Sequence, residues 1–368
     1  MKKLKVGILG ATGMVGQNYV RLLENHPWFE VVYLAASTRS SGKKYSEAVL
    51  GRWQMNSLIP ENIKNIIIED VANVKKAKEK CDFVFSAFEI PDKEMVKTIE
   101  EKYAEAGMPV VSNASANRPT PDVPMLIPEI NPEHLKMIDQ QKKNHKWDKG
   151  FIVVKPNCSL QSYLTPIFAL EKAGYPIKKI FVTTLQAVSG AGYPGVPSLD
   201  MIDNVVPYIK GEEEKTEIEP FKILSDIKDG KFIQRKDIEI SAHCTRVPVT
   251  DGHLACINIL FGNKKPTEEK IKEIWKNFKG LPQELKLPFA PIHPIIYKEE
   301  ENRPQPKKDR DNDKGMAVTV GRLRKCKIFD YKFVALSHNT VRGAAGGGIL
   351  NAELLVKKNY LNFVNLKI

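Results

Sequence analysis

The sequence KVGILGATGMVG, at residues 5–16, joins a short apolar run to three glycines spaced three residues apart. The alternating run before Gly10 predicts a strand, and the helical spacing of the apolar residues in 19–23 predicts a helix after the turn. A strand, a glycine turn and a helix form the phosphate-binding start of a dinucleotide-binding unit, although the spacing here is GxxGxxG rather than GxGxxG. In such a turn Gly10 permits the sharp bend, Gly13 lets the backbone approach a pyrophosphate, and Gly16 lets the helix pack closely on the strand. We therefore expect a cofactor to be bound by Gly10, Thr12, Gly13, Met14, Val15 and Gly16.

The end of the second predicted strand, residues 29–36, indicates which dinucleotide is bound. A site selective for NAD usually carries an acidic residue there, roughly 20 residues beyond the glycines, to bind the ribose 2′-hydroxyl. This sequence has Ser37 and Arg39 instead. A hydroxyl and a guanidinium suit a 2′-phosphate, so we predict NADP(H). The alternative is that Arg39 is only a solvated loop residue.

The rest of the chain predicts an α/β protein with two domains. Apolar strands at 83–87 and 109–112 flank a charged helix at 93–107, which continues the Rossmann-type dinucleotide-binding pattern. Later runs at 179–188, 238–247 and 253–261 are long and predict an α+β domain with a mostly antiparallel sheet and helices on one face. We expect residues 1–157 to form the dinucleotide-binding domain and residues 158–339 a catalytic and dimerisation domain. A helix rich in small residues, 340–368, is expected to pack back on the first domain.

Cys158 is the strongest candidate for a catalytic side chain. It lies in Lys155-Pro156-Asn157-Cys158-Ser159, directly after an apolar strand and before a predicted helix at 160–170. The positive end of a helix dipole stabilises a thiolate, and backbone N–H groups there can hold an oxyanion on a substrate carbonyl. A lone cysteine is more often buried and structural, but the polar flanking residues favour an accessible nucleophile.

Composition excludes several classes of function. The five cysteines are widely spaced without a CxxC pair, which fits free thiols in the cytoplasm and predicts no metal site. No segment is long and apolar enough to span a membrane or resembles a secretory signal. The net charge of +12 comes from dispersed lysines interleaved with acidic residues, as in residues 210–215. We interpret it as a solvated surface that attracts small anions and do not expect nucleic-acid or membrane binding.

Five segments together resemble the aspartate-β-semialdehyde dehydrogenase family, most closely its archaeal and fungal-like branch. They are the glycine turn, the Pro-Asn-Cys-Ser sequence, QAVSGAG at 186–192, RVPVTDGH at 246–253, and NTVRGAAG at 339–346. The resemblance extends over residues 6–355. It implies reductive dephosphorylation of L-4-aspartyl phosphate by NADPH, at the branch to lysine, methionine and threonine. Cys158 would displace phosphate, and hydride transfer to the resulting thioester would release the semialdehyde.

The resemblance also implies roles for particular residues. His253 matches the base that activates the thiol and later acts as an acid, and Gln186 matches the residue that orients the acyl group. The expected substrate contacts are Arg246 for the α-carboxylate, Glu219 for the ammonium, and Lys222, Arg118 and Asn157 around the phosphate. Glu219 and Lys222 are three residues apart on a predicted helix, a spacing that more commonly marks a surface ion pair. Further cofactor contacts are expected from Ser189, Gly190 and Asn339.

Other activities remain open at this level. A malonyl-CoA or succinyl-CoA reductase would use the same thioester and hydride chemistry. An N-acetyl-γ-glutamyl-phosphate reductase would have the same architecture, but its substrate lacks a free ammonium. A dinucleotide-sensing module would require Cys158 and His253 to be inert. Members of the family assemble as homodimers or homotetramers, and the sequence does not distinguish the two.

Overall fold

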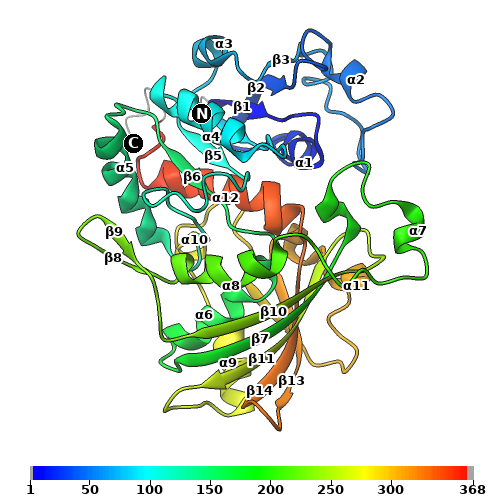
Figure 1. The fold of residues 1–368 in the computed structure, drawn as a ribbon, viewed down its shortest axis with the longest axis vertical. Coiled ribbons are helices and arrows are strands. Elements are labelled where there is room, and N and C mark those ends of the chain that lie inside the picture. Colours follow the sequence, from blue (N-terminus) through cyan, green and yellow to red (C-terminus); the bar gives the residue numbers. More distant parts are fainter. Residues whose placement is uncertain (1–2, 363–368) are drawn as a thin grey trace.

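The computed structural model describes residues 3–362 and contains two large sheets, one in each half of the molecule (Figure 1). The first sheet is parallel throughout, in the order β3-β2-β1-β4-β5-β6. Its strands are β1 (Leu4–Leu9), β2 (Phe29–Ala36), β3 (Glu69–Asp70), β4 (Phe83–Ser86), β5 (Val110–Ser112) and β6 (Ile152–Val154). Most of these strand residues are buried, as expected for a parallel sheet covered on both faces. The α/β alternation predicted from the sequence is confirmed.

Helices connect the strands of this first sheet. They are α1 (Met14–Leu22), α2 (Tyr45–Ala48), α3 (Val74–Lys80), α4 (Lys93–Glu105), the 3₁₀ turn η1 (Pro132–Lys136) and α5 (Met137–His145). The carboxyl ends of β1, β4, β5 and β6 therefore meet at one edge of the sheet, where the glycine turn and Cys158 follow β1 and β6.

The second sheet is mixed, in the order β10-β7-β11-β14-β13-β12. Its three inner pairings are antiparallel and its two outer pairings are parallel. The strands are β7 (Ile177–Gln186), β10 (Glu239–Arg246), β11 (His253–Phe261), β12 (Ile295–Lys298), β13 (Val318–Lys325) and β14 (Tyr331–Ser337). Along β7, buried Ile180, Val182 and Thr184 alternate with more exposed residues, so one face of the sheet is covered. The predicted, mostly antiparallel sheet is confirmed.

Shorter elements complete this half of the molecule. The α-helices are α6 (Leu164–Lys172), α7 (Ser198–Met201), α8 (Glu212–Ile223), α9 (Glu268–Asn277), α10 (Leu281–Glu284) and α11 (Pro306–Asp309). A small hairpin joins β8 (Asp226–Lys228) to β9 (Lys231–Ile233), and 3₁₀ turns lie at η2 (Ser159–Ser162), η3 (Val188–Ala191) and η4 (Asn312–Gly315). The buried Trp275 of α9 donates a hydrogen bond from its indole to Pro166 O of α6, which joins the two covering helices.

The predicted helix at 160–170 begins later than expected. Residues 159–162 form η2, and the α-helix starts only at Leu164. Pro166 accounts for the shift, because proline has no N–H to donate to the carbonyl four residues earlier. Proline is tolerated best in the first turn of a helix, where its missing N–H has no intrahelical partner in any case.

The last described helix, α12 (Gly346–Lys357), returns the chain to the first half of the molecule, where it lies between the two sheets in Figure 1. Ile349 and Leu350 join the apolar core formed by Val6 and Ile8 of β1. A Cβ added at Gly348 would lie 1.9 Å from the Tyr19 hydroxyl, so glycine is the residue that fits there with Tyr19 in its present position. Helix α12 thus packs against β1 of the first sheet, but it is shorter than the helix expected over 340–368. Residues 341–345 form the π-helical segment η5, α12 ends at Lys357, and residues 363–368 lie outside the described part.

Candidate active site

The glycine turn has the geometry that a dinucleotide phosphate requires. Gly10 has a φ of +78°, and a Cβ at Gly16 would lie 2.2 Å from Gly10 O, so both positions exclude larger residues. Gly13 is different, because the nearest protein atom to its Cβ would be 3.6 Å away. Gly13 caps α1 without a side-chain hydrogen bond, and the first turn of α1 contains no acidic residue. Free N–H groups and the helix dipole therefore face space that a pyrophosphate fits.

A pocket of about 490 Å³ lies beside this turn, between the two halves of the molecule. Gly13, Met14 and Val15 line it on one side. The other lining residues come from segments distant in the sequence, and include Arg118, Lys155, Asn157, Cys158, Ser189, Gly190, Glu212, Lys215, Asn339 and Gly343. The structure thus brings candidate cofactor-binding and catalytic residues to one cavity.

The predicted 2′-phosphate contacts lie outside this cavity. Ser37 and Arg39 are exposed and follow β2 at its carboxyl end, next to β1 in the sheet. This edge also carries the glycine turn, so the two residues are at the place where a dinucleotide would extend away from the pocket.

Cys158 and His253 form a close pair. The Cys158 Sγ lies 3.4 Å from His253 Nε2, although the residues come from the end of β6 and the start of β11. The backbone N–H of Ala187 donates a hydrogen bond to His253 Nδ1 at 3.0 Å. Because Nδ1 is the acceptor, the proton of the neutral ring lies on Nε2 and points to the sulfur. The His253 ring is therefore arranged to donate a hydrogen bond from Nε2–H to the Cys158 sulfur.

Burial determines the resting charges of this pair. It raises the pKa of the Cys158 thiol, and the Glu212 carboxylate raises it further, whereas Lys155, Arg118 and Arg246 act in the opposite direction without cancelling the rise. Burial and Arg246 lower the pKa of His253 to about 3. The thiol form is therefore favoured, in contrast to the thiolate expected from a helix dipole. Cys158 precedes only a four-residue 3₁₀ turn and is partly buried.

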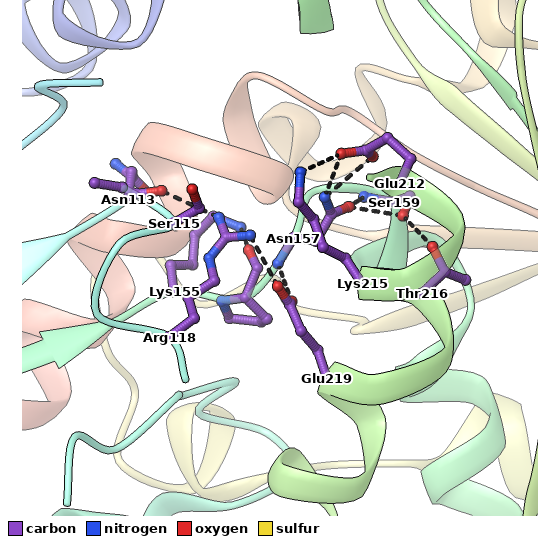
Figure 2. A network of polar contacts seen from close by, with 12 residues as sticks. Asn113, Ser115, Arg118, Lys155, Asn157, Ser159, Glu212, Lys215, Thr216 and Glu219 are labelled. Atoms are coloured by element: carbon purple, nitrogen blue, oxygen red, sulfur yellow. Dashed lines mark hydrogen bonds and ion pairs between the residues drawn. The ribbon is translucent and has the colours of Figure 1, made fainter. Parts of the chain in front are cut away.

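Glu212 is the centre of a second cluster, at the N-terminus of α8 (Figure 2). Its carboxylate accepts hydrogen bonds from Asn157 Nδ2 at 2.9 and 3.0 Å, from Gln186 Nε2 at 3.2 Å and from Lys215 Nζ at 3.0 Å. Burial acts to raise the pKa of Glu212, but Lys215 and the two amides outweigh it, so its pKa is lowered. The cluster fixes an ionised carboxylate next to Cys158.

Glu219 lies two turns further along α8, and both of its carboxylate oxygens accept hydrogen bonds from other residues of the chain. One carboxylate oxygen accepts from Arg118 Nη1 at 3.0 Å, and the other accepts from the backbone N–H of Asn157 at 2.6 Å (Figure 2). Arg118 also donates to Asn113 O at 3.1 Å. Glu219 thereby links the Arg118 loop to the loop that carries Cys158.

Lys222 does not reach the pocket. Its ammonium donates to the carbonyls of Arg118 and Thr120, at 2.8 and 2.7 Å, and lies 5.2 Å from the centre of the Phe232 ring. The phosphate contact predicted at Lys222 and the ammonium contact predicted at Glu219 are therefore not supported by position, because neither side chain lines the pocket. Sequence reasoning missed Glu212 and Lys215, which have the same spacing of three residues on the same helix and do line the pocket.

The remaining predicted residues lie in or directly behind the pocket wall. Arg246 donates to Ala187 O at 2.8 Å, and a Cβ on Gly190 would lie 2.9 Å from its guanidinium. Asn339 donates to Ser189 Oγ at 2.8 Å and accepts from the Gly252 N–H, so it ties the 189–192 segment to the strand end before His253.

Two further observations concern other classes of site. Within residues 3–362, no group of three side chains suited to metal binding occurs. In the same described part, none of the helices combines the length and apolar character that a membrane span requires.

Comparison with known proteins agrees with this site. Residues 5–138 match the family model "Semialdehyde dehydrogenase, NAD binding domain", and residues 165–342 match "Semialdehyde dehydrogenase, dimerisation domain". An aspartate-semialdehyde dehydrogenase of Archaeoglobus fulgidus is 46% identical over 359 residues, covering 98% of this chain and 100% of the relative. One from Schizosaccharomyces pombe is 44% identical over 360 residues, covering 97% and 99%.

Solved structures agree as well. The crystal structure of the Candida albicans aspartate semialdehyde dehydrogenase with NADP superposes with a TM-score of 0.87 at 40% identity, covering 97% of this chain and 99% of that one. A Vibrio cholerae structure at 24% identity has a TM-score of 0.75, covers 97% and 99%, and shares the fold. The chain therefore belongs to the aspartate-semialdehyde dehydrogenase family.

Proposed function

We propose that this pocket catalyses the reductive dephosphorylation of L-4-aspartyl phosphate to L-aspartate 4-semialdehyde, through a thioester on Cys158. The observation that carries the proposal is the Cys158–His253 pair, 3.4 Å apart, in a cavity lined on its other side by a dinucleotide turn. NADP(H) fits the turn and, when bound, supplies the hydride. The enzyme is an NADP-dependent oxidoreductase of amino-acid biosynthesis, and its relatives favour the acyl phosphate over the acyl-CoA alternative.

The cations around the pocket suit an anionic substrate. We assign the phosphate to Arg118 and Lys215, with Asn157 beside them, and the substrate ammonium to Glu212. Each of these side chains lines the cavity. Arg246, beneath Gly190, is suited by its planar fork to the α-carboxylate. Gln186, held by Glu212, would orient the acyl group.

In the proposed acylation step, the acyl group of the substrate is transferred from phosphate to the sulfur of Cys158. Cys158 attacks the carbonyl carbon, phosphate leaves, and a thioester forms. The His253 Nε2–H points at the sulfur and would stabilise negative charge as it develops there or on the adjacent oxygen. Glu219 and Lys222 then serve as positioning residues, because they hold the Arg118 loop and Cys158 loop in place.

We propose that the chain assembles through the open face of the second sheet, as a dimer or a pair of dimers. Partly exposed Phe181, Leu185 and Leu254 lie on the face opposite the buried residues of β7 and β11. The matched dimerisation domain covers these strands. Sedimentation of a Leu185→Glu variant tests this, and an unchanged oligomer would exclude the face.

We also propose a cytoplasmic location, since all five cysteines are free. We further propose that the domain boundaries lie between residues 157 and 158 and between residues 339 and 340.

The experiment that tests the activity is reduction of NADP in the presence of aspartate semialdehyde, with and without phosphate. Phosphate-dependent reduction is expected. Absence of phosphate dependence, together with NADPH oxidation by malonyl-CoA or succinyl-CoA, would contradict the acyl-phosphate assignment.

A further inference from the structure

An acidic side chain without a role in the proposed reaction lies in the wall of the active-site pocket. Glu89 lies between β4 and α4 and lines the same cavity as Cys158 and Arg118. One of its carboxylate oxygens accepts the backbone N–H of Ser115 at 2.9 Å, and the other accepts the Ser115 hydroxyl at 3.0 Å. Ser115 lines the cavity as well. One residue of the pocket wall therefore binds both oxygens of a carboxylate.

The loop that binds Glu89 is also the one that carries Arg118 (Figure 2). The backbone N–H of Arg118 donates to Ser115 O at 3.2 Å, so the two residues belong to one tight turn. Arg118 donates from Nη1 to Glu219 and from Nη2 to Asn113 O, but its buried Nε has no hydrogen-bond partner within residues 3–362. The turn thus offers a hydroxyl, a backbone N–H and a guanidinium N–H, which are donors suited to an oxyanion.

Further cations lie around the same carboxylate. Lys93, in the first turn of α4, forms an ion pair with Glu89 and lines the cavity together with Lys215. Burial lowers the pKa of Lys93, and the charges of Lys215 and Arg118 lower it further, so the three cations are close enough to interact. Lys215 and Arg118 are the cations assigned above to the phosphate. Glu89 is therefore an internal anion held among groups that an anionic substrate requires.

We propose that Glu89 competes with phosphate for this part of the pocket, an inference that rests on the function proposed above. In the free protein the Glu89 carboxylate satisfies the Ser115 donors, and it must leave them when inorganic phosphate or the phosphate group of the substrate binds. Its side chain is 42% exposed, so the carboxylate can turn into solvent without becoming a buried, unpaired charge. The exchange replaces one anion by another and makes or breaks no covalent bond.

This competition predicts that removing Glu89 improves phosphate binding, whereas removing a residue that binds phosphate weakens it. The apparent dissociation constant of a ligand rises by the reciprocal of the fraction of molecules whose site is free. Occupancy of the Ser115 donors by Glu89 in roughly 80 to 90% of molecules would raise it five- to tenfold.

Two measurements test the competition. One is the phosphate concentration that half-saturates NADP reduction with aspartate semialdehyde, and the other is the dissociation constant of inorganic phosphate, from calorimetry on the NADP-loaded protein. Glu89→Gln removes the charge, so both values should fall roughly fivefold or more. Glu89→Asp keeps the charge but is one methylene group too short to reach both Ser115 donors, so both values should still fall at least threefold. An effect of charge alone would leave Glu89→Asp like the wild type.

Glu94→Gln is the matched control for charge. Glu94 is an exposed residue of α4 outside the cavity, and its substitution changes the net charge by the same amount, so both values should stay within about twofold. Ser115→Ala removes one of the donors for which the two anions compete. In the double variant, the gain from Glu89→Gln should therefore be smaller than in the wild-type background.

The outcomes are separable. Unchanged or weaker phosphate binding in Glu89→Gln would overturn the competition, and so would equal gains in Glu89→Gln and Glu94→Gln. A Glu89→Asp protein that matches the wild type, or a gain from Glu89→Gln that is undiminished without the Ser115 hydroxyl, would overturn it as well. Phosphate binding that tightens in Glu89→Gln, in a protein whose wild type shows no phosphate-dependent NADP reduction, would support the competition and contradict the proposed function.

Discussion

The Glu219 carboxylate accepts the backbone N–H of Asn157 at 2.6 Å, across 62 residues of sequence, and so holds the residue that precedes the nucleophile. Its other oxygen binds Arg118, whose side chain is 11% exposed. Removing the carboxylate would leave a buried cation and a buried N–H without their acceptor.

Glu219→Ala should therefore lower the free energy of unfolding by about 3 kcal/mol, as expected when one partner of a buried ion pair is removed. Urea denaturation measures the change. Glu214→Ala, on an exposed position of the same helix, is the control and should change stability by less than about 0.5 kcal/mol. Equal effects of the two substitutions would show that the Glu219 contacts contribute little.

The structure predicts a slowly reacting Cys158 thiol, whereas the sequence predicts a reactive thiolate. Because burial raises its pKa, little thiolate exists at neutral pH, and iodoacetamide should label Cys158 slowly in the ligand-free protein. Labelling should become faster as the pH rises. Cys326 is the internal comparison, since hydrogen bonds from the backbone N–H groups of Phe329 and Ile328 lower its pKa. Peptide mass spectrometry should find Cys326 labelled first at pH 7, and the reverse order would contradict the buried neutral thiol.

Cys158→Ala should abolish turnover, by about 10³-fold or more, because no thioester can form. NADPH binding, followed by fluorescence, should be nearly unchanged, since the glycine turn belongs to the other half of the molecule. Substantial remaining activity would rule out the covalent mechanism.

Arg39→Ala tests the choice of cofactor. The residue is exposed at the carboxyl end of β2 and makes no hydrogen bond or ion pair within the described part of the chain, so its removal should not disturb the fold. Losing a charged hydrogen bond to the 2′-phosphate should raise the KM for NADPH roughly tenfold or more while leaving that for NADH unchanged. An equal effect on both cofactors would exclude Arg39 as the 2′-phosphate contact.

Features of the fold and site that depend on local sequence could be predicted, whereas those that depend on contacts between distant segments could not. The glycine turn imposes a local backbone requirement, and strand periodicity reports burial, so both were visible in the sequence. The pKa of Cys158 depends on burial by distant segments, including Gly343, where an added Cβ would lie 2.9 Å from that of Cys158. No local pattern contains that information. The start of α6 was in principle predictable, because Pro166 constrains it locally.

The substrate contacts on α8 illustrate the limit most clearly. Glu212 with Lys215 and Glu219 with Lys222 have identical spacing on one helix, seven residues or about 10 Å apart. Spacing alone cannot distinguish them, whereas the position of the pocket along the helix does. Only the first pair lines the cavity.

The two lysines should accordingly respond differently to substitution. Lys215→Ala removes a cation from the pocket, so the KM for phosphate in NADP reduction should rise roughly 10- to 100-fold, the effect of losing a hydrogen bond between charged groups. Lys222→Ala removes two hydrogen bonds to the carbonyls of Arg118 and Thr120, and should lower the free energy of unfolding by about 2 kcal/mol. Its KM for phosphate should change much less than that of Lys215→Ala, because Lys222 acts on the phosphate site only through the Arg118 loop. Steady-state kinetics and urea denaturation on both variants separate these effects. A larger rise in KM for Lys222→Ala than for Lys215→Ala would indicate that Lys222, and not Lys215, binds the phosphate.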